Sequence, residues 1–357
     1  MVRSLLLVGV VATTGGACTN DGSPASPPPA GDGAPDVAAD TPADGKPEAD
    51  QPDDGKSGLT DLTRAVVEDA RRSVTEPLRL IPSGAHFIGQ FRVGPTLAYP
   101  PTAKLWEEGE KKQVEFGIAM DVLRTCLGSL ETIEDISFGF DSESHLVVVG
   151  RGKGLGTQEQ WRCFERTTIA KDKEFDFVFT GTAQDQGPQL MSSDDPGFFV
   201  GDDTVVLIDG DWRTEFEALR AGTRKPAIEG PLAAAVARVN TESPFWMAGL
   251  SEGPLVAALD DGALHEMEDF TFAMQIEDDQ LRVAINADAG QPSDAKAARD
   301  ELQHTFDEFK AVLPTLGLSS SFSSRVKFEV EGDEVSVAMS FEPSEIESMR
   351  TTLEGLF

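Results

Sequence analysis

The chain has few basic residues, few histidines and few cysteines for its length. Its 357 residues include 30 Lys and Arg against 62 Asp and Glu, which gives a formal net charge of -32. Nucleic acid is excluded as a partner, because its phosphates need Lys and Arg to displace their counterions. Peripheral attachment to an anionic membrane surface is disfavoured for the same reason. After its first residues, the chain also lacks the roughly 20 consecutive apolar residues of a membrane helix.

Patterns that indicate metal binding or catalysis are scarce. The four histidines form no H-E-x-x-H pair and share no zinc spacing with cysteine or aspartate; they are His86, His145, His265 and His304. Paired acids such as Asp202-Asp203 fit no EF-hand loop and are more simply hairpin residues that keep the surface soluble. We therefore predict no catalytic residue, no cofactor and no metal site, although side chains distant in sequence could still converge in the fold.

The first eighteen residues have the composition of an export signal. Arg3 supplies a positive charge, Leu5 to Ala12 form an apolar segment too short to span a bilayer, and Thr13 to Ala17 are small. With Cys18, this segment resembles the lipobox of bacterial lipoproteins, in which a small residue precedes a cysteine that is lipidated and becomes the new N-terminus. Gly15 departs from the family's pattern, which usually has Leu three residues before the cysteine.

The resemblance implies that residues 1–17 are a signal peptide and that Cys18 carries a lipid. The protein is then exported to the cell envelope and attached through that lipid to a bacterial membrane, with the outer membrane or cell surface as the expected place. The alternative is an ordinary secretory signal cut near Ala17, which would leave Cys18 as a free thiol.

Residues 18–58 form an acidic segment rich in Pro, Gly and Ala. From Thr19 to Lys56 there is no aromatic residue, Leu, Ile or Met. Such a segment cannot bury enough apolar surface to offset its ordering entropy, so we predict a disordered tether. Metal binding by its scattered Asp residues is the alternative. A helix is expected from about Thr60, because apolar residues then recur at helical spacing until Pro77.

The rest of the chain resembles a duplication. Leu130 to Phe140 (LETIEDISFGF) align without a gap with Leu264 to Met274 (LHEMEDFTFAM). In each copy a second strand, a helix, another hairpin and a closing helix follow. The later hairpins turn at Gly201-Asp202 and Gly332-Asp333. Each copy also has an opening strand, and the first copy adds a segment that ends in a helix near Gly128. Chance similarity of alternating apolar segments is the alternative to duplication.

This element order predicts an α+β fold. Hairpins pair antiparallel, and the helices that follow them cover one face of the sheet. We expect two tandem repeats of antiparallel hairpins with helices packed on one face. The first repeat, with its N-terminal helix, spans residues 59–240, and the second spans 241–357. In outline only, this organisation resembles uncharacterised exported bacterial proteins built from tandem α+β repeats, without a motif that names a family.

Two cysteines remain in the body of the chain. Cys126 lies near the end of the helix before Gly128, and Cys163 lies in the helix after the first hairpin. An exported protein meets an oxidising compartment, so we predict a Cys126–Cys163 disulfide if both helices cover the same side of that hairpin. Two buried, unpaired thiols are the alternative.

One glycine-rich stretch is a candidate phosphate site. Gly150 to Thr157 (GRGKGLGT) follow a strand and precede a helix, where backbone amides can bind phosphate. The spacing fits neither G-x-G-x-x-G nor G-x-x-x-x-G-K-[ST]. We therefore interpret the stretch as a flexible turn.

The leading functional hypothesis is a lipid-anchored cell-envelope protein with a non-enzymatic binding or structural role. Its partners would be the membrane, through the lipid, and an envelope protein or small ligand. The runner-up is an envelope hydrolase whose site assembles from residues distant in sequence. A deep pocket with converging His, Ser or acidic groups would favour the hydrolase, and a broad, shallow face would favour binding.

Overall fold

Ten strands form one antiparallel sheet in the computed structural model, which describes residues 76–142, 145–175, 177–179, 187–190, 196–209, 212–251 and 267–354. The described residues belong to one compact unit. Residues 1–75 lie outside these ranges, and with them the signal peptide, Cys18, the tether and the helix near Thr60. Those features and the domain boundaries at residues 17, 58 and 240 stay predictions.

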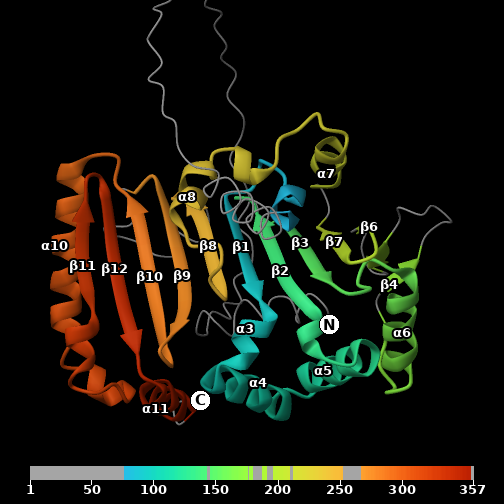
Figure 1. Cartoon of the computed structure of the whole chain (residues 1–357), viewed down its shortest axis with the longest axis horizontal. Coiled ribbons are helices and arrows are strands. Elements are labelled where there is room, and N and C mark those ends of the chain that lie inside the picture. Colours follow the sequence, from blue (N-terminus) through green and yellow to red (C-terminus); the bar gives the residue numbers. More distant parts are fainter. Residues whose placement is uncertain are drawn as a thin grey trace, which may run out of the picture. The chain divides into compact units, whose positions relative to one another are not determined.

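The strand order across the sheet is β11-β12-β10-β9-β8-β1-β2-β3-β7-β6, and all neighbours are antiparallel (Figure 1). The strands are β1 (Phe87–Arg92), β2 (Ile133–Phe140), β3 (Leu146–Gly152), β6 (Gly197–Val200), β7 (Thr204–Ile208), β8 (Phe245–Leu250), β9 (Asp269–Glu277), β10 (Gln280–Asp288), β11 (Lys327–Glu331) and β12 (Glu334–Phe341). A separate two-stranded sheet pairs β4 (Phe177–Phe179) with β5 (Pro188–Leu190).

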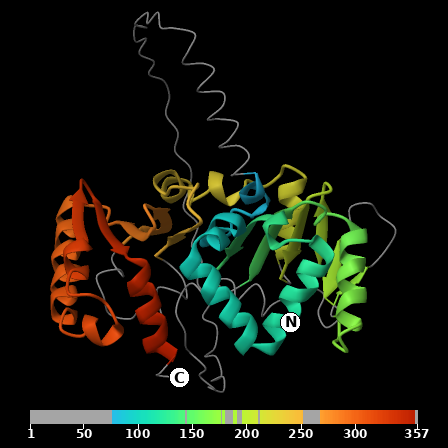
Figure 2. The same ribbon diagram turned by 60° about the horizontal axis from the view of Figure 1, so that its bottom comes forward.

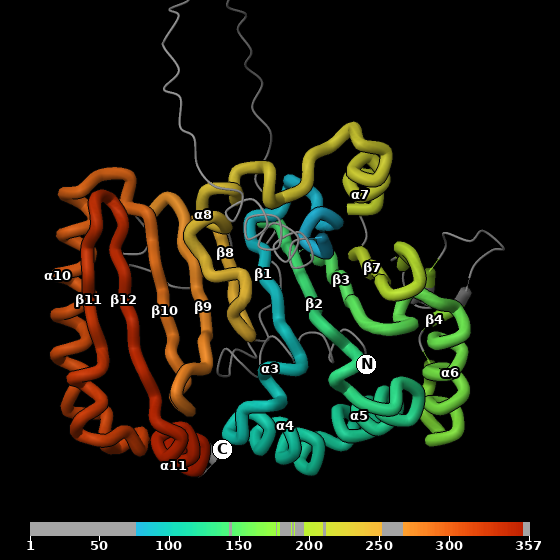
Figure 3. Tube along the Cα trace, in the orientation of Figure 1, coloured from blue at the N-terminus to red at the C-terminus, as the bar shows by residue number. Residues whose placement is uncertain are grey.

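The sheet has an approximate two-fold symmetry about its central strands. Outward from the centre, β1-β2-β3-β7-β6 on one side corresponds to β8-β9-β10-β12-β11 on the other (Figure 3). Arg92 faces Asp135 across β1 and β2, and Leu250 faces Asp269 across β8 and β9. Arg92 and Leu250 are thus equivalent positions, and so are Gly89 and Met247, which lie three residues before them. Gly89 and Met247 face each other across β1 and β8. The predicted equivalence of the two halves, and with it the predicted fold class, is confirmed.

The later hairpins of the two repeats turn in the same way. Gly201 follows β6 with a φ of 68°, and Gly332 follows β11 with a φ of 64°. L-residues rarely adopt this left-handed conformation, so glycine is the residue that both turns require. The first turn is one residue longer, because three residues separate β6 from β7 and two separate β11 from β12.

The longer helices lie on one face of the sheet, as predicted (Figure 2). In the second repeat Ala295 and Ala298 of α10 pack against Ala287 of β10 and Val335 of β12. In the first repeat Trp106 of α4 stacks on Phe91 of β1. The helices of this face are α4 (Pro100–Lys112), α5 (Val114–Leu127), α6 (Gln158–Ile169), α10 (Pro292–Phe309) and α11 (Pro343–Glu354), and α3 (Val93–Ala98) connects β1 to α4.

Two short helices lie on the opposite face of the sheet, a placement that the sequence did not predict: one covers the first repeat, and the other lies over β8 and β9. They are α7 (Arg213–Arg220) and α8 (Ala233–Arg238). Phe216 of α7 and Ala235 of α8 belong to a buried apolar cluster with Val147, Val149 and Trp246. The first repeat is therefore buried on both faces near its centre. In the second repeat this face carries polar residues such as Asn286, whose Nδ2 donates to Thr271 Oγ1 at 3.2 Å.

Aromatic rings line the helix-covered face along the central strands. Phe87 of β1 stacks on Phe140 of β2 with ring centroids 4.7 Å apart, and Phe138 lies beside Phe245 of β8 at 6.4 Å. Gly89 lies among these rings, and a Cβ there would stand 2.4 Å from the Phe138 ring. Any larger residue at this central position would displace the aromatic row.

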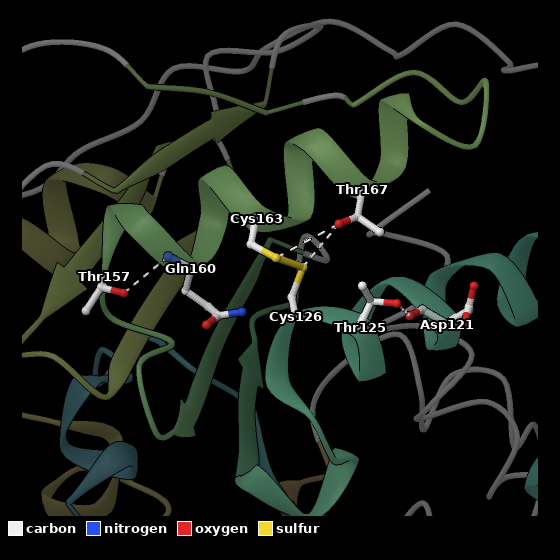
Figure 4. Close-up of a disulfide and its surroundings, with 7 residues drawn as sticks. All are labelled: Asp121, Thr125, Cys126, Thr157, Gln160, Cys163 and Thr167. Atoms are coloured by element: carbon white, nitrogen blue, oxygen red, sulfur yellow. Dashed lines mark hydrogen bonds between the residues drawn. A yellow bond between two sulfur atoms is a disulfide. The ribbon is translucent and has the colours of Figure 1, made fainter.

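The predicted disulfide is present. Cys126 at the end of α5 bonds to Cys163 in α6, with Cα atoms 5.8 Å apart (Figure 4). The hydroxyl of Thr167 lies 3.4 Å from the Cys126 sulfur. α6 begins where expected because the Thr157 hydroxyl caps it, accepting a hydrogen bond from the Gln160 amide. The two helices therefore do lie on the same side of the β2–β3 hairpin.

Candidate functional site

A pocket of about 350 Å³ lies where β1 ends and β2 begins. Two other pockets among the described residues are larger, about 570 and 470 Å³, but they are more open to solvent and no buried charged side chain lines them. The smaller pocket lies beside a buried carboxylate. Its lining comprises Gln90, Arg92, Gly94, Pro95, Glu131, Ile133, Glu134, Asp135 and Arg151.

Asp135 is the buried carboxylate, with 2% of its surface exposed. Arg151 donates from Nε at 2.9 Å and from Nη2 at 2.5 Å, and both donors reach the same oxygen, Oδ2. The other oxygen, Oδ1, is buried and accepts no hydrogen bond. The Gln90 amide lies close enough to favour ionisation of Asp135, but it does not meet hydrogen-bond geometry at Oδ1; its Nε2 also donates to Ser137 Oγ at 3.2 Å. We therefore treat Oδ1 as the unsatisfied acceptor of the pocket.

Burial raises the pKa of the Asp135 carboxyl above its ordinary value. Arg151 opposes this rise because its guanidinium stabilises the ionised form, and Glu134 adds to it through like-charge repulsion. The carboxylate is thus held in a site that stabilises its charge incompletely. A cationic donor placed at Oδ1 would lower that pKa.

The register of three strands brings the charged residues together. Arg92 of β1 faces Asp135 of β2, and Asp135 faces Arg151 of β3, so all three positions lie on one face of the sheet. The β2–β3 register shifts between Ile133 and Asp135. At this irregularity Glu134 also reaches the guanidinium, with Oε2 3.2 Å from Arg151 Nε. Bulges of this kind commonly redirect a side chain beside a functional site.

Arg92 stands at the pocket wall without a carboxylate partner among the described residues. Its Nη1 donates to the Glu242 carbonyl at 2.8 Å. No ion pair joins it to Asp135, although the two positions face each other in the sheet. Together with Glu131 and Glu134, the pocket has three carboxylates and two guanidiniums in its lining.

In the second repeat, an arginine side chain lies at the place that corresponds to the pocket. Asp269 corresponds to Asp135, and its β10 neighbour is Asp288 where the first repeat has Arg151. Arg238 of α8 donates to Asp269 Oδ1 and lies 3.5 Å from Asp288 Oδ2 and 3.9 Å from Glu334 Oε2. Burial again raises the pKa of Asp269, and Arg238 opposes the rise.

The features weighed in the sequence have local structural roles. The glycine stretch is a turn, as interpreted, and the Gly154 amide donates to Asp203 Oδ1 at 2.9 Å, so an internal carboxylate holds it. His145 Nδ1 lies 2.8 Å from Asp141 Oδ2 at the β2–β3 turn, and His304 is exposed on α10. His265 lies outside the described residues. Within those residues, no group of three or more His, Cys, Asp or Glu side chains is placed to hold a metal ion.

Sequence reasoning overlooked two motif spacings. Gly249 to Gly253 fit G-x-S-x-G, with Ser251 directly after β8. A nucleophile elbow needs a sharp, strained turn from strand to helix. Ser251 has no positive φ, and its amide still donates to the Glu268 carbonyl at 3.2 Å, so it continues the strand ladder. The S-x-x-K spacing occurs at Ser293, which is exposed on α10 with its hydroxyl on Asp294, and at Ser324, whose hydroxyl donates to the Ser321 carbonyl at 2.7 Å.

The pocket residues were not predicted as a site. In the sequence, Asp135 is singled out only by its place in the aligned segments LETIEDISFGF and LHEMEDFTFAM. The available signal was the presence of Asp135 and Arg151 inside otherwise apolar strands, since charges at such positions are usually paired or functional.

No protein-family model matches the chain, and no curated protein matches its sequence. Among solved structures, the chain is similar to crystal forms of the protein TP0453. Form III has a TM-score of 0.47 and 9% identity over 77% of this chain and 98% of that one. Form I has a TM-score of 0.45 and 12% identity over 79% of this chain and 97% of that one. Form IV has a TM-score of 0.41 and 10% identity over 78% of this chain and 95% of that one. Similarity this low carries no functional inference. Within the described residues, the helices are too short or too polar to span a bilayer.

Proposed function

We propose that this chain is an exported, lipid-anchored cell-envelope protein that binds a small ligand and is not an enzyme. The lipobox resemblance at Cys18 supports the anchor, and the predicted tether of residues 18–58 would hold the sheet away from the membrane. The observation that supports the binding role is Asp135 Oδ1, a buried acceptor without a donor beside a pocket.

Leaving such an acceptor unsatisfied costs about 1–3 kcal/mol, and more for a charged group. Natural proteins keep few of these groups, and those they keep often belong to functional sites. A ligand that donates to Oδ1 would offset this cost on binding. The pocket volume of about 350 Å³ lies at the small end of the range of ligand sites.

The runner-up, an envelope hydrolase, has less support from the described residues. The pocket lining supplies carboxylates, guanidiniums and an amide, and the raised pKa of Asp135 is the one feature there that suits acid–base chemistry. Ser251, the residue with hydrolase motif spacing, belongs to the β8 ladder rather than to this lining.

The binding role is tested by a thermal-shift screen of small polar metabolites against the detergent-solubilised mature protein. A ligand at a hundred times its Kd should add about 2.7 kcal/mol of stability. The stabilisation should be lost in Asp135→Asn and kept in Asp269→Asn, the matched variant of the second repeat. A screen without a ligand whose effect depends on Asp135 contradicts the proposed function.

A further inference from the structure

Resting on the proposed binding role, we propose that the pocket takes a small zwitterion, with its ammonium group at Asp135 Oδ1 and its carboxylate at Arg92. The ligand class is that of a free amino acid or a short peptide with both ends unblocked.

The inner end of the pocket favours an ammonium group. Oδ1 is an acceptor with no donor, and Arg151 is already committed to Oδ2 and to Glu134. A charged donor makes a shorter and stronger hydrogen bond to a carboxylate than a neutral one does. Asp135 is removed from solvent, so this contact is screened less than a surface ion pair.

The second repeat shows the same preference within the molecule itself. At the position of Asp269, equivalent to Asp135, the fold places the guanidinium of Arg238. There the protein supplies its own cation to the carboxylate. In the first repeat the cation at Oδ2 comes from Arg151, and the second oxygen of this pocket-lining residue is left buried without a donor.

Arg92 supplies the complementary end. The Glu242 carbonyl holds Nη1, which orients the planar guanidinium and leaves its other nitrogens for a ligand. Arginine binds carboxylates with a fixed, two-pronged geometry. Facing positions on antiparallel strands have Cβ atoms about 4.5–5.5 Å apart, so the two ligand charges must lie a few bonds from each other.

The balance of charges disfavours simpler ligands. A plain cation would meet two guanidiniums, and a plain anion would meet three carboxylates. A ligand with both charges pairs each one with its complement. Like-charge contacts and unpaired partners are the usual means by which binding sites reject the wrong ligand.

The proposal is tested with alanyl-alanine and two blocked analogues on the detergent-solubilised mature protein. Calorimetry should show binding of the free dipeptide. N-acetyl-alanyl-alanine, which lacks the ammonium, and alanyl-alaninamide, which lacks the carboxylate, should each bind at least about tenfold more weakly. Equal binding of a blocked analogue, or no binding of the free dipeptide, overturns the proposal.

Variants assign the two ends of the ligand. Asp135→Asn and Arg92→Gln should each weaken alanyl-alanine binding about tenfold, whereas Asp269→Asn should leave it unchanged. Arg92 is at the pocket wall, so its variant tests the site even if Asp135→Asn fails to fold. Unchanged affinity in Arg92→Gln overturns the assignment of the carboxylate end. A metabolite that binds through Asp135 while dipeptides do not would refute the zwitterion and leave the binding role standing.

Discussion

At the scale of single residues, Asp135 couples the stability of the protein to pH. Burial raises its pKa above the ordinary value of 3.8, and Glu134 adds to the rise while Arg151 opposes it. The folded state therefore holds the proton more tightly than the unfolded state. The stability contributed by this group is fully present below the unfolded pKa and is lost as pH rises through the folded pKa.

We predict that the free energy of unfolding of the wild type, relative to Asp135→Asn, falls as pH rises through the folded pKa of Asp135. Urea unfolding of both proteins between about pH 4 and pH 7 measures this difference. Taking the difference cancels the pH dependence contributed by the other carboxyls. One of these is Asp269, whose pKa is also raised by burial. A difference that grows with pH, or stays constant, would show that the carboxylate is fully stabilised in the fold.

At the scale of secondary-structure elements, the disulfide joins α5 to α6. It closes a loop with a sequence separation of 37 residues that contains the β2–β3 hairpin. In the chain-entropy treatment, a loop of this length gives about 3–4 kcal/mol of stability. The helices α10 and α11 of the second repeat have no such bond, since the chain has no further cysteine beyond Cys18.

We predict that a Cys126→Ser and Cys163→Ser double variant loses about 3–4 kcal/mol of unfolding free energy in urea. A reducing agent should destabilise the wild type by a similar amount and leave the double variant unchanged, which serves as the control. Two reactive thiols from this pair in the denatured, unreduced protein would mean that the bond does not form.

Elements with one buried face were the easiest to predict from sequence. In β11, Phe328 and Val330 pack towards α10 and Glu329 between them is exposed, so the residues alternate as a half-buried strand does. In β3, by contrast, Val147 to Val149 are all buried, because α7 covers the other face of the first repeat. A continuous apolar run does not reveal which helices cover which face, so the sequence did not predict the helices on the second face of the sheet.

The candidate site was harder to predict for a related reason. Arg92 and Asp135 face each other only through the β1–β2 register, and residues 93–134 separate them in the chain. Nothing local to either residue specifies that pairing. The duplication identified Asp135 and Asp269 as equivalent, but their arginines come from different elements, a strand and a helix, so the repeat alone does not reveal the partners.

At the scale of the whole molecule, the anchor remains the main prediction from sequence. We expect Cys18→Ser to release the protein from the membrane fraction of its host. A net charge of -32 disfavours binding to anionic lipid once the acyl group is gone. Immunoblots of membrane and soluble fractions measure the distribution. If the variant still pellets with membranes after a high-salt wash, the lipid is not what attaches the protein.

The pairing of β1 with β8 has a consequence for the history of the chain. Gly89 facing Met247 is the contact that two copies of one repeat would make across an isologous dimer interface. Fusion of the copies turns that interface into an internal seam. A homodimer must carry the same side chain at both of its sites, whereas a fused chain is free of that constraint. Both copies of the aspartate now have an arginine, from β3 in the first and from α8 in the second, and the first copy keeps a buried oxygen without a hydrogen-bond donor.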